Sequence, residues 1–507
     1  QWSRQVGASL QTKAAAGDRV VLALPGGPEY VAAFLGCAYA GLVAVPVFSP
    51  DEGNNEHHLR LIGIIEDCTP VAVIVPDGIA ERNLMPLLDV PHLTVPPYRP
   101  GQEPTGLARK PGIAEDTLLF LQYTSGSTGS PKGVMVTHGC LRANAATIHM
   151  ATGMQAATVM VTWLPLYHDM GLIGCILSPL IAGAEIVLMP TRAFVTRPVR
   201  WLRAISRYRG TISGGPDFAY RLCCDRIGDD QRGSLDLSSW SVAFCGAEPV
   251  RPDTVYDFTD RFGACGLRNN AFFPCYGLAE ATLLISGSTT DRDDVVGHFA
   301  ADALARGQAA PARDGSSIVC CGKIMEGVQV RIVDPDRMVG LPDGAIGEIC
   351  AAGPSIALGY WNRPRDTKRV FQQSLDGDEG HYLRTGDLGF LMGGRLFVTG
   401  RLKDLIILRG HNVYPQDVEE RIEARVAGVR KGRCSVFKVD GVTGEGVGIA
   451  CEVNRTLYRK LGAAAIVQEI VDAVSTQLDE PPVLCLLLDS GNLPRTTSGK
   501  KKRSGCR

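Results

Sequence analysis

The stretch from Tyr123 to Gly139, YTSGSTGSPKGVMVTHG, limits the possible folds more than any other part of the chain. It follows an apolar run, Thr117–Leu121, that is typical of a buried strand, and it precedes a helical pattern that begins at Cys140. Glycines let backbone N–H groups approach a ligand closely, and successive N–H groups in such a loop form an anion-binding concavity. The hydroxyl side chains add donors and Lys132 adds a positive charge. This segment therefore predicts a phosphate-binding loop between a strand and a helix.

The loop is not the common nucleotide-binding P-loop, whose pattern is G-x-x-x-x-G-K-[ST]. Counting from Gly126, the second glycine would fall at residue 131, which is Pro131, and Lys132 is followed by Gly133. A Gly/Ser-rich surface linker is the plain alternative. A linker is not expected between an apolar strand and a helix, so the sequence favours a phosphate loop of another kind.

Bulk properties exclude several classes of protein. At 507 residues the chain is too long for one compact core, so two or more domains are expected. A net charge of −1 gives no support for a nucleic-acid-binding protein. The sixteen cysteines are scattered without a C-x-x-C pair, which favours buried thiols in a reducing compartment such as the cytoplasm. No apolar run is long enough to predict a transmembrane segment. The chain opens at Gln1 inside a helical pattern, so we expect its natural start to lie upstream.

Strands and helices alternate in the first part of the chain. Ser9–Ala16 predicts the end of a helix, and the strand Arg19–Leu24, the helix Glu29–Gly41 and the strand Leu42–Val47 follow. This rhythm predicts an α/β fold with a mainly parallel sheet covered by helices. The last hundred residues predict a small α+β domain that contains the helix Ala463–Leu478.

Two neighbouring polar residues stand in the segment TWLPLYHDMGLIG, Thr162–Gly174. His168 and Asp169 could form a general acid/base pair. Neighbours in sequence do not face each other in regular structure, however, so we do not expect a catalytic dyad. A structural histidine that bonds to the backbone is the alternative.

Two further motifs suit a nucleotide. In YGLAEAT, Tyr276 offers a flat face for stacking and Glu280 offers a hard oxygen ligand for Mg²⁺, which usually takes one or two carboxylates together with phosphate oxygens. In RTGDLG, Asp387 lies in a glycine turn, and its carboxylate can accept two hydrogen bonds from vicinal hydroxyl groups. The alternatives are an ordinary helix N-terminus for the first motif and a common β-turn for the second.

TSGSTGSPKG resembles the signature loop of the adenylate-forming superfamily, which includes acyl-CoA synthetases, adenylation domains of peptide synthetases, luciferases and fatty acyl-AMP ligases. LPLYHDMGLIG, CGAEPV and YGLAEAT are most similar to the fatty acyl-AMP ligases, and the resemblance continues through RGHNVYPQDVE to LPRTTSGK near the end of the chain. His411 is a departure, because arginine is frequent at that position in the family.

The resemblance implies two domains: an N-terminal AMP- and acyl-binding domain of packed α/β sheets over residues 1–400, and a small mobile α+β domain over residues 401–507 after a hinge at 401–404. Fatty acyl-AMP ligases carry an insertion that restrains the mobile domain, and it corresponds here to residues 291–315. The segment Thr211–Tyr220 resembles part of the family's acyl pocket.

The resemblance also implies roles for individual residues. Lys500 would bind the substrate carboxylate and the α-phosphate, although a solvated basic tail at Lys500–Arg503 is the alternative. His168 would approach the same groups in an electrostatic and positional role, and Glu280, with help from Thr128, would hold Mg²⁺. The residues expected to bind ATP or AMP are Thr124, Ser125, Gly126, Ser127, Thr128, Gly129, Lys132, Gly246, Ala247, Glu248, Tyr276, Gly277, Leu278, Ala279, Asp387 and Arg401.

The implied reaction uses ATP and Mg²⁺ to convert a fatty acid into an acyl-adenylate and pyrophosphate. In the resembling subfamily the acyl group then passes to the phosphopantetheine thiol of an acyl carrier protein, which here would be a separate chain. A fatty acyl-CoA ligase is the main alternative. A catalytically silent nucleotide-binding protein is another, but intact Glu280, Asp387 and Lys500 argue against it.

Overall fold

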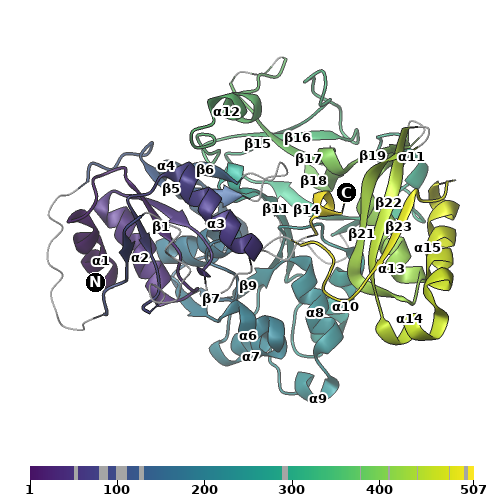
Figure 1. Ribbon diagram of the computed structural model, residues 1–507, viewed down its shortest axis with the longest axis horizontal. Coiled ribbons are helices and arrows are strands. Elements are labelled where there is room, and N and C mark those ends of the chain that lie inside the picture. The colour runs from purple at the N-terminus through teal and green to yellow at the C-terminus, as the bar shows by residue number, and fades with distance from the viewer. Residues whose placement is uncertain are drawn as a thin grey trace. The chain divides into compact units, whose positions relative to one another are not determined.

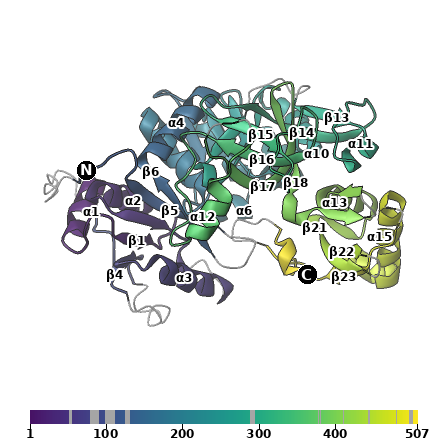
Figure 2. The same ribbon diagram turned by 90° about the horizontal axis from the view of Figure 1, so that it is seen from above.

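The computed structural model describes residues 1–50, 55–78, 90–98, 111–124, 131–287, 295–376, 378, 380–408, 411–441, 444–478, 480–495 and 501–506 (Figures 1 and 2). The chain divides into two compact units. Unit 1 comprises Gln1–Val295, Cys321–Val330 and Cys350–Thr385, and unit 2 comprises Val296–Cys320, Arg331–Ile349 and Gly386–Arg507. The domain boundary expected between residues 400 and 401 and the hinge expected at residues 401–404 remain predictions.

The first sheet of unit 1 has six strands in the order β4-β3-β1-β2-β5-β6. All neighbours are parallel except β5 and β6, which are antiparallel. This confirms the predicted βαβ rhythm. The strands are β1 (Arg19–Leu22), β2 (Val43–Pro46), β3 (Ala72–Ile74), β4 (His92–Leu93), β5 (Leu118–Thr124) and β6 (Lys132–Thr137), and the helices between them include α2 (Pro28–Ala40) and α3 (Asn55–Cys68).

The first helix, α1 (Trp2–Gln11), ends earlier than the predicted Ala16. The Asp18 carboxylate accepts a hydrogen bond of 2.8 Å from the Ala15 amide, so the residues before β1 form a turn. Short polar side chains that bond to nearby backbone compete with helix in this way. The strands that follow are apolar because both faces of the sheet are covered, and Val21, Val45 and Leu121 are fully buried.

A second run of strands in unit 1 has the order β12-β11-β10-β9-β7-β8. The pairs from β8 to β11 are parallel, and β11 and β12 are antiparallel. In open parallel sheets, ligands bind beyond the carboxyl ends of the strands. The strands are β7 (Val159–Thr162), β8 (Glu185–Leu188), β9 (Ile212–Gly215), β10 (Val242–Cys245), β11 (Phe272–Gly277) and β12 (Leu284–Gly287).

An aromatic core supports this second run of strands. Trp201 and Trp240 are fully buried and meet edge to face, with ring centroids 5.3 Å apart. The Trp201 indole N–H donates to Ser213 Oγ at 2.7 Å, so this buried polar group has a hydrogen-bond partner. Other helices of unit 1 are α4 (His138–Thr152), η2 (Met170–Leu177), α5 (Ser178–Ala182), α6 (Thr191–Thr196), α7 (Val199–Tyr208), α8 (Asp217–Arg226), α9 (Asp229–Arg232), α10 (Pro252–Gly263) and α12 (Pro364–Phe371).

Unit 2 contains a three-stranded sheet, in which β21 (Val429–Gly441) pairs antiparallel and β23 (Leu484–Leu488) pairs parallel with β22 (Gly444–Val453). Helices α13 (Pro415–Arg425) and α15 (Ala463–Leu478) bury an apolar stripe against this sheet, with Ile422 and Ile470 fully buried. The helix predicted at Ala463–Leu478 is confirmed. Other elements of this unit are β17 (Leu383–Met392, from Gly386 on), β18 (Arg395–Arg401), β19 (Ile406–Leu408), β20 (His411–Val413) and α14 (Arg455–Leu461).

The described part of the predicted insertion belongs to unit 2. Strand β13 (Val296–Phe299) pairs with the first residues of β14 (Ser316–Ile324), and α11 (Ala301–Ala305) lies against β20. Phe299 packs against Phe390 and Phe397, with ring centroids 5.0 and 5.3 Å away. These rings join the segment to a hydrophobic core that it shares with β17 and β18.

A search of the described residues finds no helix with the length and apolar character that a membrane crossing requires. All sixteen cysteines are free and most are buried, which confirms the prediction that they act as small apolar side chains.

Candidate active site

The predicted phosphate loop connects two adjacent strands. Thr124 is the last residue of β5 and Lys132 the first of β6, and the two residues lie directly opposite each other in the antiparallel pair. Ser125, Gly126, Ser127, Thr128 and Gly129 lie outside the described residues, so the sheet fixes the two ends of the loop and the loop itself stays a prediction.

Lys132 is engaged by two side chains. Its Nζ lies 2.7 Å from Asp366 Oδ2 and 5.0 Å from the centroid of the Tyr360 ring. The hydrogen bond from Lys132 lowers the pKa of the Asp366 carboxyl. The Tyr360 hydroxyl in turn donates to Glu280 Oε1 at 2.8 Å. One tyrosine therefore connects the lysine of the phosphate loop to the predicted magnesium ligand.

Tyr360 is held in place by backbone and side-chain bonds. It forms a β-bridge to Val134 in β6, and its amide donates to Thr367 Oγ1 in α12 at 2.9 Å. A side chain at Gly359 would place Cβ 2.2 Å from Thr367, so the close approach requires glycine. Burial and the charge of Glu280 raise the pKa of Tyr360, which keeps its hydroxyl protonated and able to donate.

The turn that carries Glu280 is rigid. A Cβ at Gly277 would lie 1.8 Å from the Leu283 carbonyl oxygen, so only glycine fits there. Asn144 of α4, which is fully buried, donates from Nδ2 to the Leu284 carbonyl at 2.9 Å and accepts from the Leu284 amide at 3.1 Å. Tyr276, Leu278 and Ala279 belong to the same turn, and Tyr276 is buried. The predicted contact between Tyr276 and an adenine stays a prediction.

The segment after β10 approaches β11 closely. A Cβ at Gly246 would lie 2.8 Å from the Cys275 carbonyl oxygen, and Ala247 has a positive φ of 69°. Glu248 Oε1 accepts a hydrogen bond of 2.8 Å from the Phe218 amide in the first turn of α8. Glu248 therefore caps a helix, and the segment's predicted place beside an adenine is untested.

A second carboxylate lies close to Glu248. Asp217 is buried; its Oδ1 accepts from the Arg251 amide at 2.9 Å and its Oδ2 accepts from Thr254 Oγ1 at 3.1 Å. Burial and the negative charge of Glu248 raise the pKa of Asp217 to about 7. Two neighbouring acids in an apolar setting cannot both ionise readily, so Asp217 exchanges a proton near neutral pH.

His168 and Asp169 do face each other, and our expectation that they would not is wrong. His168 Nδ1 lies 2.5 Å from Asp169 Oδ1. The rule for regular structure fails because the chain turns here: the His168 amide donates to the Pro165 carbonyl at 3.2 Å, and Asp169 caps η2 by accepting from the Met170 amide at 2.7 Å. The Met170 amide also approaches His168 Nδ1 at 3.4 Å, so the side chain of Asp169 and the backbone both contact this ring nitrogen. The ring is oriented, which suits a positional role.

Asp387 and Arg401 meet in unit 2. They are directly opposite in β17 and β18, and Asp387 Oδ1 lies 3.4 Å from Arg401 Nε. The predicted glycine turn is wrong, because residues 383–392 form the strand β17. Gly386 has a φ of 70° within this strand, and its amide donates to the buried Glu348 carboxylate at 3.1 Å. Arg401 is 54% exposed. The pair is accessible to a ligand on the arginine side.

Lys500 lies outside the described residues, but the chain on both sides of residues 496–500 is anchored. Arg495 and Lys501 form an antiparallel bridge, and the Lys502 amide donates to the Pro494 carbonyl at 2.9 Å. The alternative of a solvated tail therefore does not hold for Lys501 to Arg503, because backbone and side-chain bonds hold this segment against α13 and β21.

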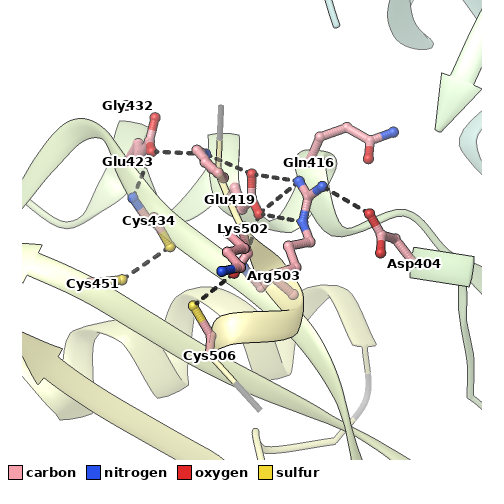
Figure 3. Close-up of polar contacts among 12 residues, drawn as sticks. Asp404, Gln416, Glu419, Glu423, Gly432, Cys434, Cys451, Lys502, Arg503 and Cys506 are labelled. Carbon is pink, nitrogen blue, oxygen red and sulfur yellow. Dashed lines mark hydrogen bonds and ion pairs between the residues drawn. The ribbon is translucent and has the colours of Figure 1, made fainter. Parts of the chain in front are cut away.

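Glu419 of α13 holds the cations that follow Lys500. Lys501 Nζ lies 2.7 Å from Glu419 Oε2, and Arg503 Nη2 lies 2.9 Å from Glu419 Oε1. Arg503 Nη1 also lies 3.4 Å from Asp404, and Figure 3 shows the guanidinium between the two carboxylates. The Glu419 side chain is only 2% exposed, and although burial alone would raise its pKa, Lys501 and Arg503 hold the pKa below its usual value.

Sequence reasoning missed several supporting residues: Tyr360, Asp366, Asn144, Glu419 and Arg503. The partners of Tyr360 and Asn144 are far away in sequence, so no local pattern indicated them. Glu419 did leave a signal, because a glutamate between the apolar residues Val418 and Ile422 of an amphipathic helix faces the core.

The comparisons with known proteins agree on one family. The family model described as AMP-binding enzyme matches residues 1–361. The medium-chain-fatty-acid–acyl-carrier-protein ligase JamA of Moorena producens is 40% identical, with 100% of this chain and 88% of the relative covered. The long-chain-fatty-acid–AMP ligase FadD23 of Mycobacterium tuberculosis is 34% identical, with 99% and 88% covered. The crystal structure of fatty acyl-adenylate ligase from L. pneumophila with acyl adenylate and pyrophosphate is 36% identical, with 100% and 89% covered and a TM-score of 0.75.

The raised pKa of Asp217 predicts a pH-dependent stability of unit 1. A native pKa of about 7 against an ordinary value of 3.8 means that the folded state binds the proton more tightly, so stability falls as pH rises from about 4 to about 7. Asp217→Asn removes this loss, and its unfolding midpoint should rise relative to the parent as pH increases. Tryptophan fluorescence reports this unit, because all five tryptophans lie in it. Exposed Asp230→Asn is the control, and a constant difference across pH would contradict the assignment.

Removing the charge of Glu419 should loosen unit 2. Glu419→Gln leaves Lys501 and Arg503 without their buried partner, and breaking a buried ion pair costs about 3–5 kcal/mol. We expect faster hydrogen exchange in β21, where the Val436 amide donates to Glu419 at 2.9 Å, and in residues 501–506. Glu469→Gln, an exposed change on α15, should leave exchange unaltered. Unchanged protection in Glu419→Gln would show that the cluster contributes little.

Proposed function

Because the chain belongs to the AMP-binding enzyme family, we propose that it activates a fatty acid with ATP as an acyl-adenylate and passes the acyl group to the phosphopantetheine thiol of a separate acyl carrier protein. The observation that carries this proposal is the 40% identity to a fatty-acid–acyl-carrier-protein ligase over the full length of the chain. The matched region includes every motif on which the proposed chemistry depends.

In the first step, a carboxylate oxygen of the fatty acid attacks the α-phosphorus of ATP. A bond forms between that oxygen and the phosphorus, the bond from the phosphorus to the bridging oxygen breaks, and pyrophosphate leaves. The protein contributes positioning and neutralisation of charge. We assign the triphosphate to residues 124–132 and the approach of the carboxylate to the α-phosphate to Lys500 and His168.

The nucleoside part of ATP is assigned to two groups of residues. Tyr276 and the backbone of Gly246–Glu248 would bind adenine, and Asp387 with Arg401 would bind ribose. The contact between Asp387 and Arg401 supports this assignment, since the arginine orients a carboxylate that can accept hydrogen bonds from two ribose hydroxyl groups.

The residues present fit a magnesium ion that arrives with the nucleotide. The described residues contain no cluster of three or more His, Cys, Asp or Glu side chains able to hold a metal by themselves. Mg²⁺ commonly uses one or two carboxylates and completes its shell with phosphate oxygens, so Glu280 is a suitable single protein ligand. When bound, the ion would neutralise charge on the departing pyrophosphate. Tyr360 orients the Glu280 carboxylate through its hydrogen bond.

In the second step, the carrier's thiolate attacks the acyl carbonyl carbon, a thioester forms and AMP leaves. Free CoA offers the same thiol and is the alternative acceptor. The names of two relatives, both fatty-acid–acyl-carrier-protein ligases, favour the carrier.

Replacing Lys500 tests the first step. The protein is incubated with ATP, Mg²⁺ and a medium-chain fatty acid, with and without CoA, and the products are measured by mass spectrometry. The parent should accumulate acyl-AMP that persists with CoA, and Lys500→Ala should form none while keeping its fold. Lys502→Ala is the matched control and should stay active. Near-normal activity of Lys500→Ala would refute its role, and conversion to acyl-CoA would establish a CoA ligase.

Replacing Tyr360 tests how Glu280 is held. Tyr360→Phe keeps the ring beside Lys132 but removes the hydrogen bond to Glu280. A hydrogen bond to a charged group contributes about 1.5–3 kcal/mol, so acyl-AMP formation should fall about tenfold or more. Calorimetry of ATP binding should also show a higher Mg²⁺ requirement. The exposed change Tyr39→Phe serves as control. An unchanged Mg²⁺ requirement would show that Tyr360 does not affect Mg²⁺ binding through Glu280.

A further inference from the structure

Helices α6 and α7 carry a concentration of positive charge that the rest of the chain does not explain. Residues 191–210, TRAFVTRPVRWLRAISRYRG, contain no aspartate or glutamate, although the net charge of the whole chain is −1. All six arginines in this stretch are exposed, and five of them form what we call the arginine surface: Arg192, Arg197, Arg200, Arg203 and Arg207.

The helical repeat places these arginines together. Arg200, Arg203 and Arg207 have the spacing of one face of α7, while Trp201, Leu202 and Ile205 on the other face are buried. Helix α6 lies beside α7 (Figure 1), and the ring centroids of Phe194 and Trp201 are 5.5 Å apart. Arg200 Nη1 reaches the Ala193 carbonyl of α6 at 3.5 Å, which joins the two helices on the charged side.

The arginine surface lacks neutralising partners. The sixth arginine of the stretch, Arg209, lies 3.5 Å from Asp236. Among the residues that the structure describes, no carboxylate pairs with any of the five arginines of the surface. Like charges three and four residues apart on a helix repel each other and destabilise it. Because no carboxylate in the described part of the chain relieves this repulsion, the arginine surface is well suited to bind an anionic partner.

We propose that the arginine surface binds an acidic protein, namely the acyl carrier protein that receives the acyl group. This inference rests on the proposed function. Arginine also suits the phosphate of the carrier's phosphopantetheine arm, because its planar donor fork binds phosphate through two parallel hydrogen bonds.

A protein partner fits the surface better than a membrane. An interfacial membrane helix inserts its apolar face into the bilayer, and the apolar face of α7 is already buried in the core. Tyr208, which is 44% exposed, lies next to Arg207, whose guanidinium is 5.4 Å from the tyrosine ring centroid. Tyrosine and arginine are the residues most enriched in protein interfaces.

The position of α6 and α7 links this surface to the proposed acyl chemistry. Trp163 stacks on Phe194 of α6 with a centroid distance of 4.0 Å, and Thr191 Oγ1 donates to the Trp163 carbonyl at 2.7 Å. Trp163 begins the segment that leads to His168. The helices with the arginine surface therefore support, from their buried side, the segment expected to contact the fatty acid carboxylate.

Charge reversal tests the proposal. The double variant R203E/R207E is compared with R142E/R306E, which makes the same change in net charge at arginines that are 71% and 60% exposed elsewhere. Acyl-AMP formation and acyl transfer to a purified, phosphopantetheinylated acidic acyl carrier protein are measured separately. We expect R203E/R207E to form acyl-AMP within twofold of the parent but to lose at least tenfold in kcat/KM for the carrier, through KM. Its transfer rate should also lose the salt dependence of the parent.

Other outcomes would overturn the proposal. Transfer that is equal in R203E/R207E and R142E/R306E would exclude the arginine surface as the docking site. Flotation with phosphatidylglycerol vesicles that depends on Arg203 and Arg207, with unchanged transfer, would assign the surface to a membrane. If the parent forms no acyl-AMP, the proposed function fails. Calorimetric binding of the carrier to the parent and to R203E/R207E then decides the docking proposal by itself, and equal affinities would overturn it.

Discussion

The hydrogen bond from the Tyr360 hydroxyl to Glu280, 2.8 Å long, is the contact on which the described site depends most. It joins the turn after β11 to the segment that forms an antiparallel bridge with β6, and the same ring lies beside the Lys132 ammonium. Glu280 and Lys132, which are far apart in the sequence, therefore both contact the side chain of Tyr360. The hydrogen bond from the tyrosine thus fixes the direction of the Glu280 carboxylate.

Close backbone packing fixes the positions of the turns that carry these residues. Gly246 follows β10 and Gly277 ends the neighbouring parallel strand β11, and at each position a Cβ would collide with a carbonyl oxygen of an adjacent segment. The second turn is further fixed by Asn144, whose amide bonds to the backbone of Leu284 in both directions. The functional groups thus lie on turns whose movement is limited by the adjoining strands. Such turns orient the side chains of a site before a ligand binds.

The sequence predicted the alternation of strands and helices and the order of the motifs, because hydrophobic period and glycine position are local signals. It did not predict the partners of Lys132, which are Tyr360 and Asp366, since both lie more than two hundred residues away. It misjudged His168 and Asp169 by applying a rule for regular elements to a turn. It also left a solvated tail at Lys501 and Arg503 as an alternative, because charge alone does not reveal that a buried glutamate such as Glu419 is present to receive them.

Unit 2 is assembled from three separate stretches of chain, and this has a consequence for biosynthesis. The rings of Phe299, Phe390 and Phe397 form one core, yet Phe299 leaves the ribosome long before the other two. Until about a hundred further residues have been translated, Phe299 and Leu304 lack the partners that bury them, and exposed apolar surface on a nascent chain invites aggregation. The order of translation thus leaves the apolar side chains of residues 296–320 without part of their core until Phe390 and Phe397 have been synthesised.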